Sequence, residues 1–355
     1  MSRVSFNNNP NPFHTSLKEK VDNYFRETKL KSSGGNQLVI KGFLIVFTTF
    51  FCFTTLVFFT PGVLISIILC CILGLTLAAI GFNIMHEGGH GSFSERKWLN
   101  SISAYSLNIM GGTIHFWKQK HNINHHTYTN IEGMDHDINI KYMRMHEEQP
   151  RFWYHRFQHV YWVVLYGISY MAWILIQDFQ KYFSGKMGIH DTAKKLNTRE
   201  HFIFWFTKLC YICIYLVLPI VMVGVIKTLI GFMIVGFSCG YCISIVFQLA
   251  HVVEGTNFPE PDEETNKIEQ EWAVHQIRTT ANFATNCKMT SWFLGGLNFQ
   301  VEHHLFPRIS HVHYPHINKL VKQTCSEFNV PYTEFPTVLK AFGSHLSHIR
   351  KLGNS

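Results

Sequence analysis

Histidine is the residue type most able to do chemistry in this chain, and it occurs in short clusters. The stretch "FWKQKHNINHHTYTN" alone places three imidazoles within six residues. Eight histidines belong to such clusters: His86 and His90, then His121, His125 and His126, then His251, and finally His303 and His304. Imidazole is a common metal ligand and binds zinc, copper, iron and nickel alike. The clusters therefore predict a metal site without identifying its metal.

The spacing of these histidines indicates how they could share metals. Residues four apart on an α-helix lie on one face about 5–6 Å apart, and His86/His90 and His121/His125 have this spacing. An adjacent histidine is turned by about 100°, so a doublet can address two neighbouring metals. A single zinc takes about three or four protein ligands. Eight imidazoles favour a pair of metal ions with open positions, which suits oxygen activation by non-haem iron, although ligand type does not separate iron from zinc.

Long apolar segments must position these clusters. Only 15% of the residues are charged, against roughly 25% in soluble domains. We expect four transmembrane helices, at about 42–60, 62–85, 202–226 and 229–250, each long enough for a hydrocarbon core of about 30 Å. Short turns at Pro61-Gly62 and Lys227-Thr228 would join them into two hairpins. Lys208 interrupts the third span and is expected to snorkel to the interface.

The basic residues predict the orientation of these spans. All but two of the 31 Lys and Arg residues lie outside the hairpins, so the positive-inside rule places the large segments in the cytoplasm. Both hairpins then return their histidines to one cytoplasmic face. The predicted fold is all-α: a multi-pass integral membrane protein with four spans as two hairpins and a cytosolic helical cap that holds the metals.

Three regions follow from this organisation: an N-terminal cytosolic arm at 1–38, a membrane domain at 39–320 and a cytosolic C-terminal tail at 321–355. Within the arm, Leu17, Val21 and Phe25 share a helical face that we expect to lie on the inner leaflet, with Ser16 and Glu19 as a capping box. The apolar segments 98–117 and 160–179 are expected to be interfacial or substrate-lining helices. A fifth span at 160–179 would separate the later histidines from the earlier ones.

The motifs "HEGGH", "HNINHH" and "QVEHH", placed around two membrane hairpins, resemble the three histidine boxes of integral-membrane fatty-acid desaturases. The resemblance covers roughly residues 40–320. The final box has Gln300 where other branches have histidine, which is similar to front-end acyl desaturases and bacterial linoleoyl-CoA-desaturase-like relatives without a fused cytochrome b5.

This resemblance implies roles for individual residues. The eight clustered histidines would be ligands of a di-iron centre, with Gln300 as a further candidate. Asp135 and Asp137 would orient ligand imidazoles, although their positions fit a helix cap equally well. Glu302 is another candidate for a supporting role behind the ligands.

The resemblance also implies a reaction: iron and O2 remove two hydrogens from an acyl chain, carried as acyl-CoA or acyl-lipid, and leave a cis double bond. A separate electron donor, ferredoxin or cytochrome b5, is expected because the chain has neither a His-Pro-Gly-Gly haem motif nor a G-x-G-x-x-G loop. Membrane lipid is an expected partner and nucleic acid is not. The alternatives are a hydroxylase of the same superfamily and, more distantly, a histidine-rich metal transporter, which would need histidines or carboxylates inside the spans.

Overall fold

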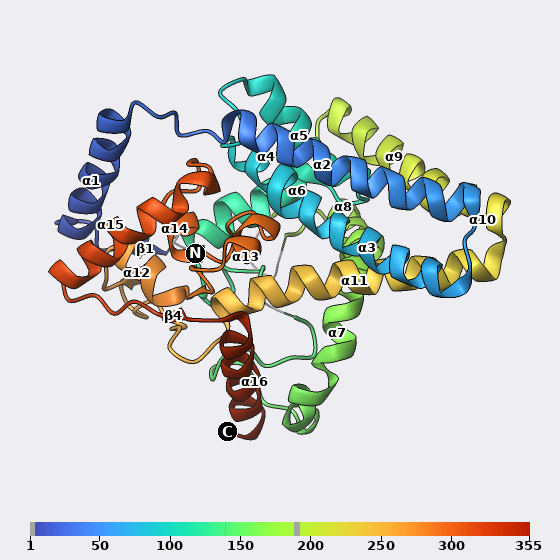
Figure 1. Cartoon of the computed structure of the whole chain (residues 1–355). Coiled ribbons are helices and arrows are strands. Elements are labelled where there is room, and N and C mark those ends of the chain that lie inside the picture. Colours follow the sequence, from blue (N-terminus) through green and yellow to red (C-terminus); the bar gives the residue numbers. More distant parts are fainter. Residues whose placement is uncertain (1–3, 139, 188–191) are drawn as a thin grey trace. The chain divides into compact units, whose positions relative to one another are not determined.

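Helices dominate this computed structural model, which describes residues 4–138, 140–187 and 192–355 (Figure 1). The chain divides into two compact units. Unit 1 comprises Met1–Gly34, Lys120–Tyr161 and Val246–Ser355, and unit 2 comprises Gly35–Gln119 and Trp162–Ile245. The helical architecture confirms that part of the predicted fold class.

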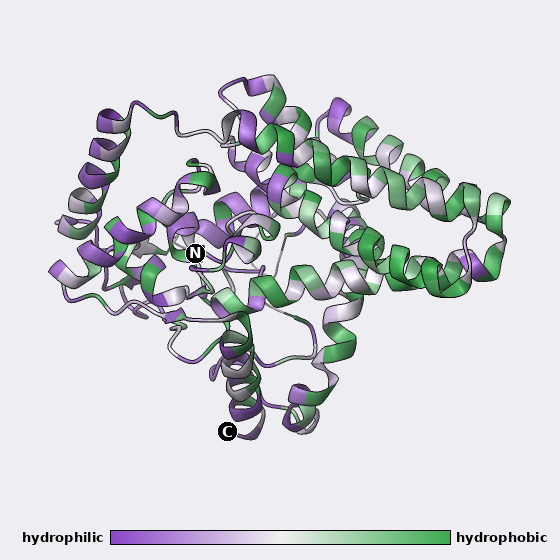
Figure 2. Cartoon of the chain, in the orientation of Figure 1, coloured by the Kyte–Doolittle hydropathy of each residue, from purple (hydrophilic) through white to green (hydrophobic). Residues whose placement is uncertain are grey.

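Unit 2 is built mainly from long apolar helices, and Figure 2 shows their hydrophobic character. The helices are α2 (Gly35–Thr54), α3 (Val63–Ile80), α4 (His86–His90), α5 (Lys97–Ile109), α6 (Ile114–Trp117), α7 (Gln158–Ala172), α8 (Asp178–Ser184), α9 (Thr198–Ile212), α10 (Leu218–Val223) and α11 (Val225–His251). π-Helical turns at Thr55–Phe59, Gly81–Met85, Trp173–Gln177 and Cys213–Val217 extend several of them. The helix α7 begins in unit 1, and α11 ends there.

Five helices of the described chain are long and apolar enough to cross a membrane. They are Gly35–Phe59, Val63–His90, Trp153–Ser184, Thr198–Val223 and Val225–His251. Four correspond to the predicted spans. The helix Trp153–Ser184 is an additional candidate, and it contains the segment 160–179 that the sequence analysis assigned to the interface. The count of four spans, their topology and the cytosolic cap stay predictions.

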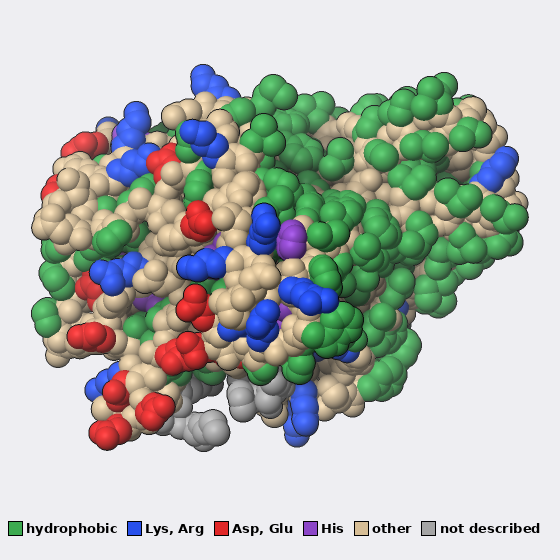
Figure 3. Space-filling model, turned by 90° about the horizontal axis from the view of Figure 1, so that it is seen from below, with side chains coloured by type: hydrophobic (Ala, Val, Ile, Leu, Met, Phe, Trp, Pro, Cys, Tyr) green, Lys and Arg blue, Asp and Glu red, His purple; other side chains and the backbone are tan. Residues whose placement is uncertain are grey.

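The outward faces of these helices are apolar. Phe43, Phe59, Val63 and Leu64 are each more than two-thirds exposed. Exposed apolar patches of this extent mark contact with something other than water. In Figure 3 hydrophobic side chains cover the surface of the helical bundle of unit 2, whereas charged side chains are scattered over the surface of unit 1. Together with their length, this composition indicates helices that lie in lipid.

The positions of the turns between paired helices depend on the backbone conformations that single residues can adopt. The first turn lies directly before Val63, at Pro61-Gly62, as predicted. The second lies at Gly224, between α10 and α11, and not at Lys227-Thr228. Gly224 has φ +90° and ψ 161°, a conformation that glycine adopts readily and other residues avoid. The charge of Lys227 favoured placing the turn at this residue. Lys227 is exposed but belongs to the first turn of α11.

Small residues bring the helices of unit 2 into close contact. A Cβ atom on Gly74 of α3 would lie 2.5 Å from the backbone oxygen of Val235 in α11. A Cβ atom on Gly240 of α11 would likewise meet the backbone oxygen of Gly167 in α7. Glycines at helix contacts let backbones approach in the way typical of membrane helices. The helix α11 therefore packs closely against both α3 and α7.

Lys208 does not snorkel, so that prediction was wrong. Its side chain is 5% exposed, and its Nζ donates to the backbone oxygens of Gly111 and Ile174, the latter at 2.8 Å. A third acceptor is Oδ2 of Asp178, which is fully buried, at 3.4 Å. A buried charge is retained where protein groups replace water around it. Here α9 supplies the cation, and the α5–α6 loop and the α7–α8 region supply the acceptors.

Unit 1 contains shorter helices and two small parallel sheets. Its helices are α1 (Pro12–Thr28), α12 (Trp272–Thr279), α13 (Lys288–Phe293), α14 (Gln300–Leu305), α15 (Tyr314–Glu327) and α16 (Val338–Asn354). Strand β1 (Ser5–Phe6) pairs with β2 (Lys267–Ile268), and β3 (Asn282–Phe283) pairs with β4 (Glu334–Phe335). 3₁₀ turns lie at Trp153–Phe157 and His311–His313, and a π-helix spans Lys118–His125 across the boundary between the units.

The apolar face of α1 packs inside unit 1. Phe13, Leu17 and Val21 are buried in one core with residues of α12, α14 and α15, such as Ile277 and Val301. Protein therefore covers the face that the sequence analysis placed on the inner leaflet. The helix also begins at Pro12, because proline suits the first helical turn.

Two further details of unit 1 differ from expectation or add to it. Because α1 begins at Pro12, Ser16 lies inside the helix and cannot form the expected capping box with Glu19. The segment 321–355 is folded within unit 1 and contributes α16, whose His345 lies with Nδ1 2.6 Å from the backbone oxygen of Val252. Both ends of the chain therefore belong to the unit that carries most of the clustered histidines.

Candidate metal centre

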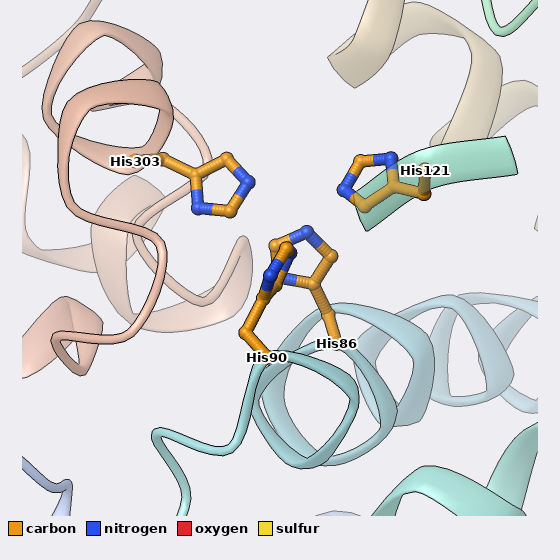
Figure 4. Close-up of side chains that lie close together, drawn as sticks. All are labelled: His86, His90, His121 and His303. Atoms are coloured by element: carbon orange, nitrogen blue, oxygen red, sulfur yellow. The ribbon is translucent and has the colours of Figure 1, made fainter. Parts of the chain in front are cut away.

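The first histidine box forms α4 of unit 2. The helix continues from α3 through the π-helical turn Gly81–Met85, and His86 and His90 lie one turn apart with ring centroids 4.6 Å from each other. Figure 4 shows both rings projecting from α4. Their ligand nitrogens lie within 4.8 Å of one another. This pair has the i, i+4 geometry that the sequence predicted.

The two glycines of "HEGGH" explain the local packing of that helix. A Cβ atom on Gly88 would lie 2.6 Å from the backbone nitrogen of Ala104 in α5, and one on Gly89 would overlap the ring of Trp117. The indole of Trp117 lies 5.7 Å from the ring centroids of both His86 and His90. Larger side chains at the glycines would displace α5 and this indole, which packs on both imidazoles.

A second group of histidines lies wholly within unit 1. His125, His251 and His304 are fully buried, and their ligand nitrogens lie within 4.8 Å of one another. Their ring centroids are separated by 4.7 to 5.0 Å. The three residues come from the π-helix Lys118–His125, the end of α11 and α14. Segments far apart in sequence thus bring three imidazoles into contact.

His121 and His303 form a separate pair in unit 1. Their rings are nearly parallel with centroids 6.1 Å apart, and a ring nitrogen of each points toward the other ring (Figure 4). The ring of His126 lies beside this pair, with its Nε2 3.3 Å from Nε2 of His121. Each doublet therefore splits between groups, since His304 belongs with His125 whereas His303 faces His121. This agrees with the expectation that adjacent histidines address different positions.

The π-helix adds a neighbour to His121. The spacing predicts that His121 and His125 share a helical face, and their rings do stack, with centroids 5.1 Å apart. In a π-helix the hydrogen bonds run from residue i to i+5, and Lys118–His125 is π-helical. The ring of His126, five residues after His121, accordingly lies 4.8 Å from that of His121 as well, and the ring of His125 also lies 4.7 Å from those of His251 and His304.

Acidic side chains contact two of these rings. Oδ2 of Asp135 lies 2.8 Å from Nδ1 of His125, and both side chains are fully buried. Oδ2 of Asp137 lies 3.0 Å from Nδ1 of His121. Of the two predicted roles for these aspartates, the contacts favour orienting the imidazoles over capping a helix. A carboxylate behind the ring raises the basicity of the opposite nitrogen, as is common for metal-bound histidine.

The charges of these pairs follow from their neighbours. Burial would raise the pKa of Asp137, but Lys120, at 2.7 Å, and His121 hold that pKa well below its usual range. Burial likewise acts to raise the pKa of Asp135, yet His125 lowers it. In return, Asp135 outweighs the burial of His125 and raises the pKa of that imidazole. Both aspartates are therefore ionised acceptors for Nδ1–H.

The other two rings of the His125 group have neutral partners at Nδ1. Oε1 of Gln276 lies 2.8 Å from Nδ1 of His304, and the backbone oxygen of Thr279 lies 3.3 Å from Nδ1 of His251. The sequence analysis did not single out these two partners, because neither lies near a histidine box or in a recognisable motif. In each of these contacts Nδ1 is engaged, which directs Nε2 toward the other imidazoles.

The sequence of this chain matches a known family. A family model described as fatty acid desaturase covers residues 61–336. The chain belongs to the fatty acid desaturase family. It is 36% identical to an acyl-lipid (8-3)-desaturase of Physcomitrium patens over 96% of this chain and 72% of the relative. It is 34% identical to an sn-1 linoleoyl-lipid 6-desaturase of Synechocystis sp. over 97% of this chain and 96% of the relative.

A third relative is the acyl-lipid (8-3)-desaturase of Mortierella alpina, 30% identical over 97% of this chain and 78% of the relative. These findings confirm the predicted family and enzyme class. The protein is an oxidoreductase that desaturates fatty acyl chains, and its family implies a metal cofactor and a fatty acyl substrate. The apolar helices and this family make the desaturase a membrane protein.

The unit 1 residues of the desaturase fit a metal ion. Nε2 of His125 and Oε1 of Gln300 are buried and have no hydrogen-bond partner among the described residues. Buried polar atoms are normally paired, so each unpaired one needs an explanation. The amide nitrogen of Gln300 lies 3.1 Å from Nε2 of His251 and 3.5 Å from Nε2 of His304. A cation among these atoms would satisfy the converging imidazole nitrogens.

Glu302 does not face this group. Its carboxylate is fully buried, and its hydrogen-bond partners in the described chain are the side chains of Asn282, Asn318 and Tyr332. Burial raises the pKa of Glu302 to about 7 despite these three donors. The residue therefore anchors α14, the helix that carries His303 and His304, through its opposite side.

Proposed function

We propose that this desaturase acts on acyl chains of membrane lipids and inserts a cis double bond between an existing double bond and the carboxyl end. The similarity to the Synechocystis sn-1 linoleoyl-lipid 6-desaturase carries this proposal, because the match covers nearly the full length of both proteins. A linoleoyl chain already has double bonds beyond carbon 6, so the new bond of that relative lies on the carboxyl side. The two acyl-lipid (8-3)-desaturases also support a lipid as the molecule that carries the acyl chain.

The metal cofactor in this proposal is a pair of iron ions. His125, His251 and His304 hold one ion, and Gln300, whose amide nitrogen lies 3.1 Å from Nε2 of His251, lies beside them as a further candidate. His121 and His303 hold the other ion, with His86 and His90 as the remaining ligands and His126 beside both positions. The separation of the histidines of unit 1 into two groups supports two ions. Bound iron, with O2, supplies the oxidant for alkyl C–H bonds, and the chain holds and orients it.

The proposal also includes an electron donor and an orientation of the protein in the membrane. A separate ferredoxin or cytochrome b5 delivers electrons, and its acidic surface is attracted by the net charge of +8. The histidines face the cytoplasm, because nearly all Lys and Arg lie outside the long apolar helices. Raising the salt concentration should slow reduction by an added donor without changing its maximal rate.

Expression in a host that lacks polyunsaturated acids tests the reaction. Defined acids, linoleate among them, are fed, and mass spectrometry locates the new double bonds and the lipid class that carries them. We expect a new bond on the carboxyl side of an existing one, in membrane lipids before other acyl pools. His125→Ala should abolish the product while the protein stays in the membrane. Hydroxylated products, or new bonds only on the methyl side, would overturn the proposal.

Cys287 offers a direct test of the orientation. Its side chain is exposed in unit 1, outside the long apolar helices. A membrane-impermeant maleimide should label it in inside-out vesicles and not in sealed right-side-out vesicles. Cys287→Ser serves as the control for labelling of other thiols. Equal labelling from the outside would place unit 1 on the opposite side of the membrane.

A further inference from the structure

A glutamine from outside the histidine boxes contacts one of the clustered rings. Gln276 lies in α12 and is fully buried, and its Oε1 lies 2.8 Å from Nδ1 of His304. An amide oxygen only accepts hydrogen bonds. The contact therefore requires the proton of the neutral imidazole to lie on Nδ1, which leaves Nε2 bare toward His125 and His251.

The surroundings hold this glutamine in place. Oγ1 of Thr129 lies 2.8 Å from the same Oε1 and 2.7 Å from the backbone oxygen of His125. It also lies 3.2 Å from Nδ1 of His304, so Gln276 is the nearer of two side chains at that nitrogen. Ala273 and Ile277, one turn before and one residue after Gln276, are fully buried in the core of unit 1. The backbone oxygen of Thr279, on the same helix, contacts His251. One short helix thus contacts two of the three rings in the group.

We propose that Gln276 is a positioning residue that selects the Nδ1-protonated tautomer of His304 and directs its Nε2 at the metal. This inference rests on the proposed role of His304 as a ligand. It also assigns the helix α12 a role in the site that no histidine box reveals.

The proposal explains a difference among the rings of unit 1. His125 and His121 have ionised aspartates behind them, whereas His304 has a neutral amide. A carboxylate acceptor raises the basicity of an imidazole more than an amide does. His304 is therefore a weaker electron donor to the metal than His125, although both belong to the same group.

Two substitutions at this position separate hydrogen bonding from packing. Gln276→Leu removes the acceptor at similar volume. Gln276→Glu keeps an acceptor oxygen, and the amide nitrogen that it replaces is buried without a hydrogen-bond partner in the described chain. Gln323→Leu is the matched control, since Gln323 lies exposed in α15 of the same unit and its side chain donates a hydrogen bond to the exposed Glu327.

Iron content per chain and the rate of iron release to a chelator are measured on purified holoprotein. Gln276→Leu should release iron about 10–100-fold faster, the usual effect of losing such a partner. Gln276→Glu should release iron no faster than the parent protein, because a carboxylate strengthens the imidazole donor, and Gln323→Leu should release it at the parent rate. Iron release from Gln276→Leu at the parent rate, or from Gln276→Glu as fast as from Gln276→Leu, would overturn the inference.

A spectroscopic measurement distinguishes positioning from general loosening of the fold. In Co(II)-substituted protein, Gln276→Glu should shift the visible absorption band because His304 becomes a stronger donor, and Gln323→Leu should leave it in place. An unshifted band in Gln276→Glu would contradict the proposal. His304→Ala distinguishes a failure of the proposed ligand role of His304 from a failure of the positioning role of Gln276. If it retains full iron, the proposed ligand role fails; if it loses iron while Gln276→Leu does not, only the positioning role fails.

Discussion

Replacing Lys208 by methionine should strongly destabilise the helices of unit 2. The ammonium of Lys208 has three donors, and the structure provides three acceptors, the backbone oxygens of Gly111 and Ile174 and the carboxylate of Asp178. Methionine has a similar length but no donor. The substitution therefore leaves Asp178 buried without its nearest cation.

The size of the effect follows from what remains around Asp178. Breaking a buried ion pair by removing one partner costs about 3–5 kcal/mol. Two contacts persist, with Nε1 of Trp173 at 3.1 Å and Nζ of Lys181 at 4.0 Å, which favours the lower end of that range. A loss of about 3 kcal/mol predicts a fall in melting temperature of about 6–12 °C for a unit of 150–250 residues.

Thermal unfolding of purified protein in mild detergent measures this shift. Adding Asp178→Asn to Lys208→Met should restore part of the lost stability, because it removes the charge left unpaired. Lys227→Met is the matched control, since Lys227 lies exposed in α11 and the same substitution removes no buried contact there. The reasoning is refuted if Lys208→Met melts within 1 °C of the parent protein, or if the double variant is less stable than the single one.

Three further substitutions test other parts of the molecule. Asp135→Asn should accelerate iron release about 10-fold or more, because a neutral acceptor replaces a carboxylate behind an imidazole; unchanged release would contradict this role. Leu17→Asp should cost about 3 kcal/mol or more and make unit 1 sensitive to protease, whereas Lys18→Asp, on the exposed face of α1, should not. Gly74→Ala should lower the melting temperature through overlap with a backbone oxygen of α11, and Gly343→Ala, with open space around it, should not.

Features encoded in continuous segments could be predicted from the sequence. Four of the long apolar helices, the turn before Val63 and the pairing of His86 with His90 depend on hydropathy or on spacing within one helix. The role of Asp135 and Asp137 could also be predicted, because both residues follow the second histidine box closely in the sequence. In each of these cases the determining residues lie within about one helix length of each other.

Other features depend on contacts that no local pattern records. The choice between an α-helix and a π-helix at Lys118–His125 changes each turn by about one residue, and it brings His126 beside His121 in addition to His125. Gln276 acts on a ring 28 residues later and a hydroxyl 147 residues earlier. Lys208 is buried because two other helical regions supply acceptors for its ammonium, and no local pattern indicates these acceptors. Its charge alone predicts exposure.

The three-segment composition of unit 1 has a consequence for biosynthesis. The apolar face of α1 leaves the ribosome before the long helices of unit 2, but the core that covers it comes from α12, α14 and α15, which follow them. The long helices of unit 2 are synthesised in between. Until α12, α14 and α15 have been synthesised, α1 lacks the core that covers its apolar face, and His304 is not yet available to His125. The group of His125, His251 and His304 therefore forms only after α14 has been synthesised, and a chain that stops before α12 would leave the apolar face of α1 exposed and prone to aggregation.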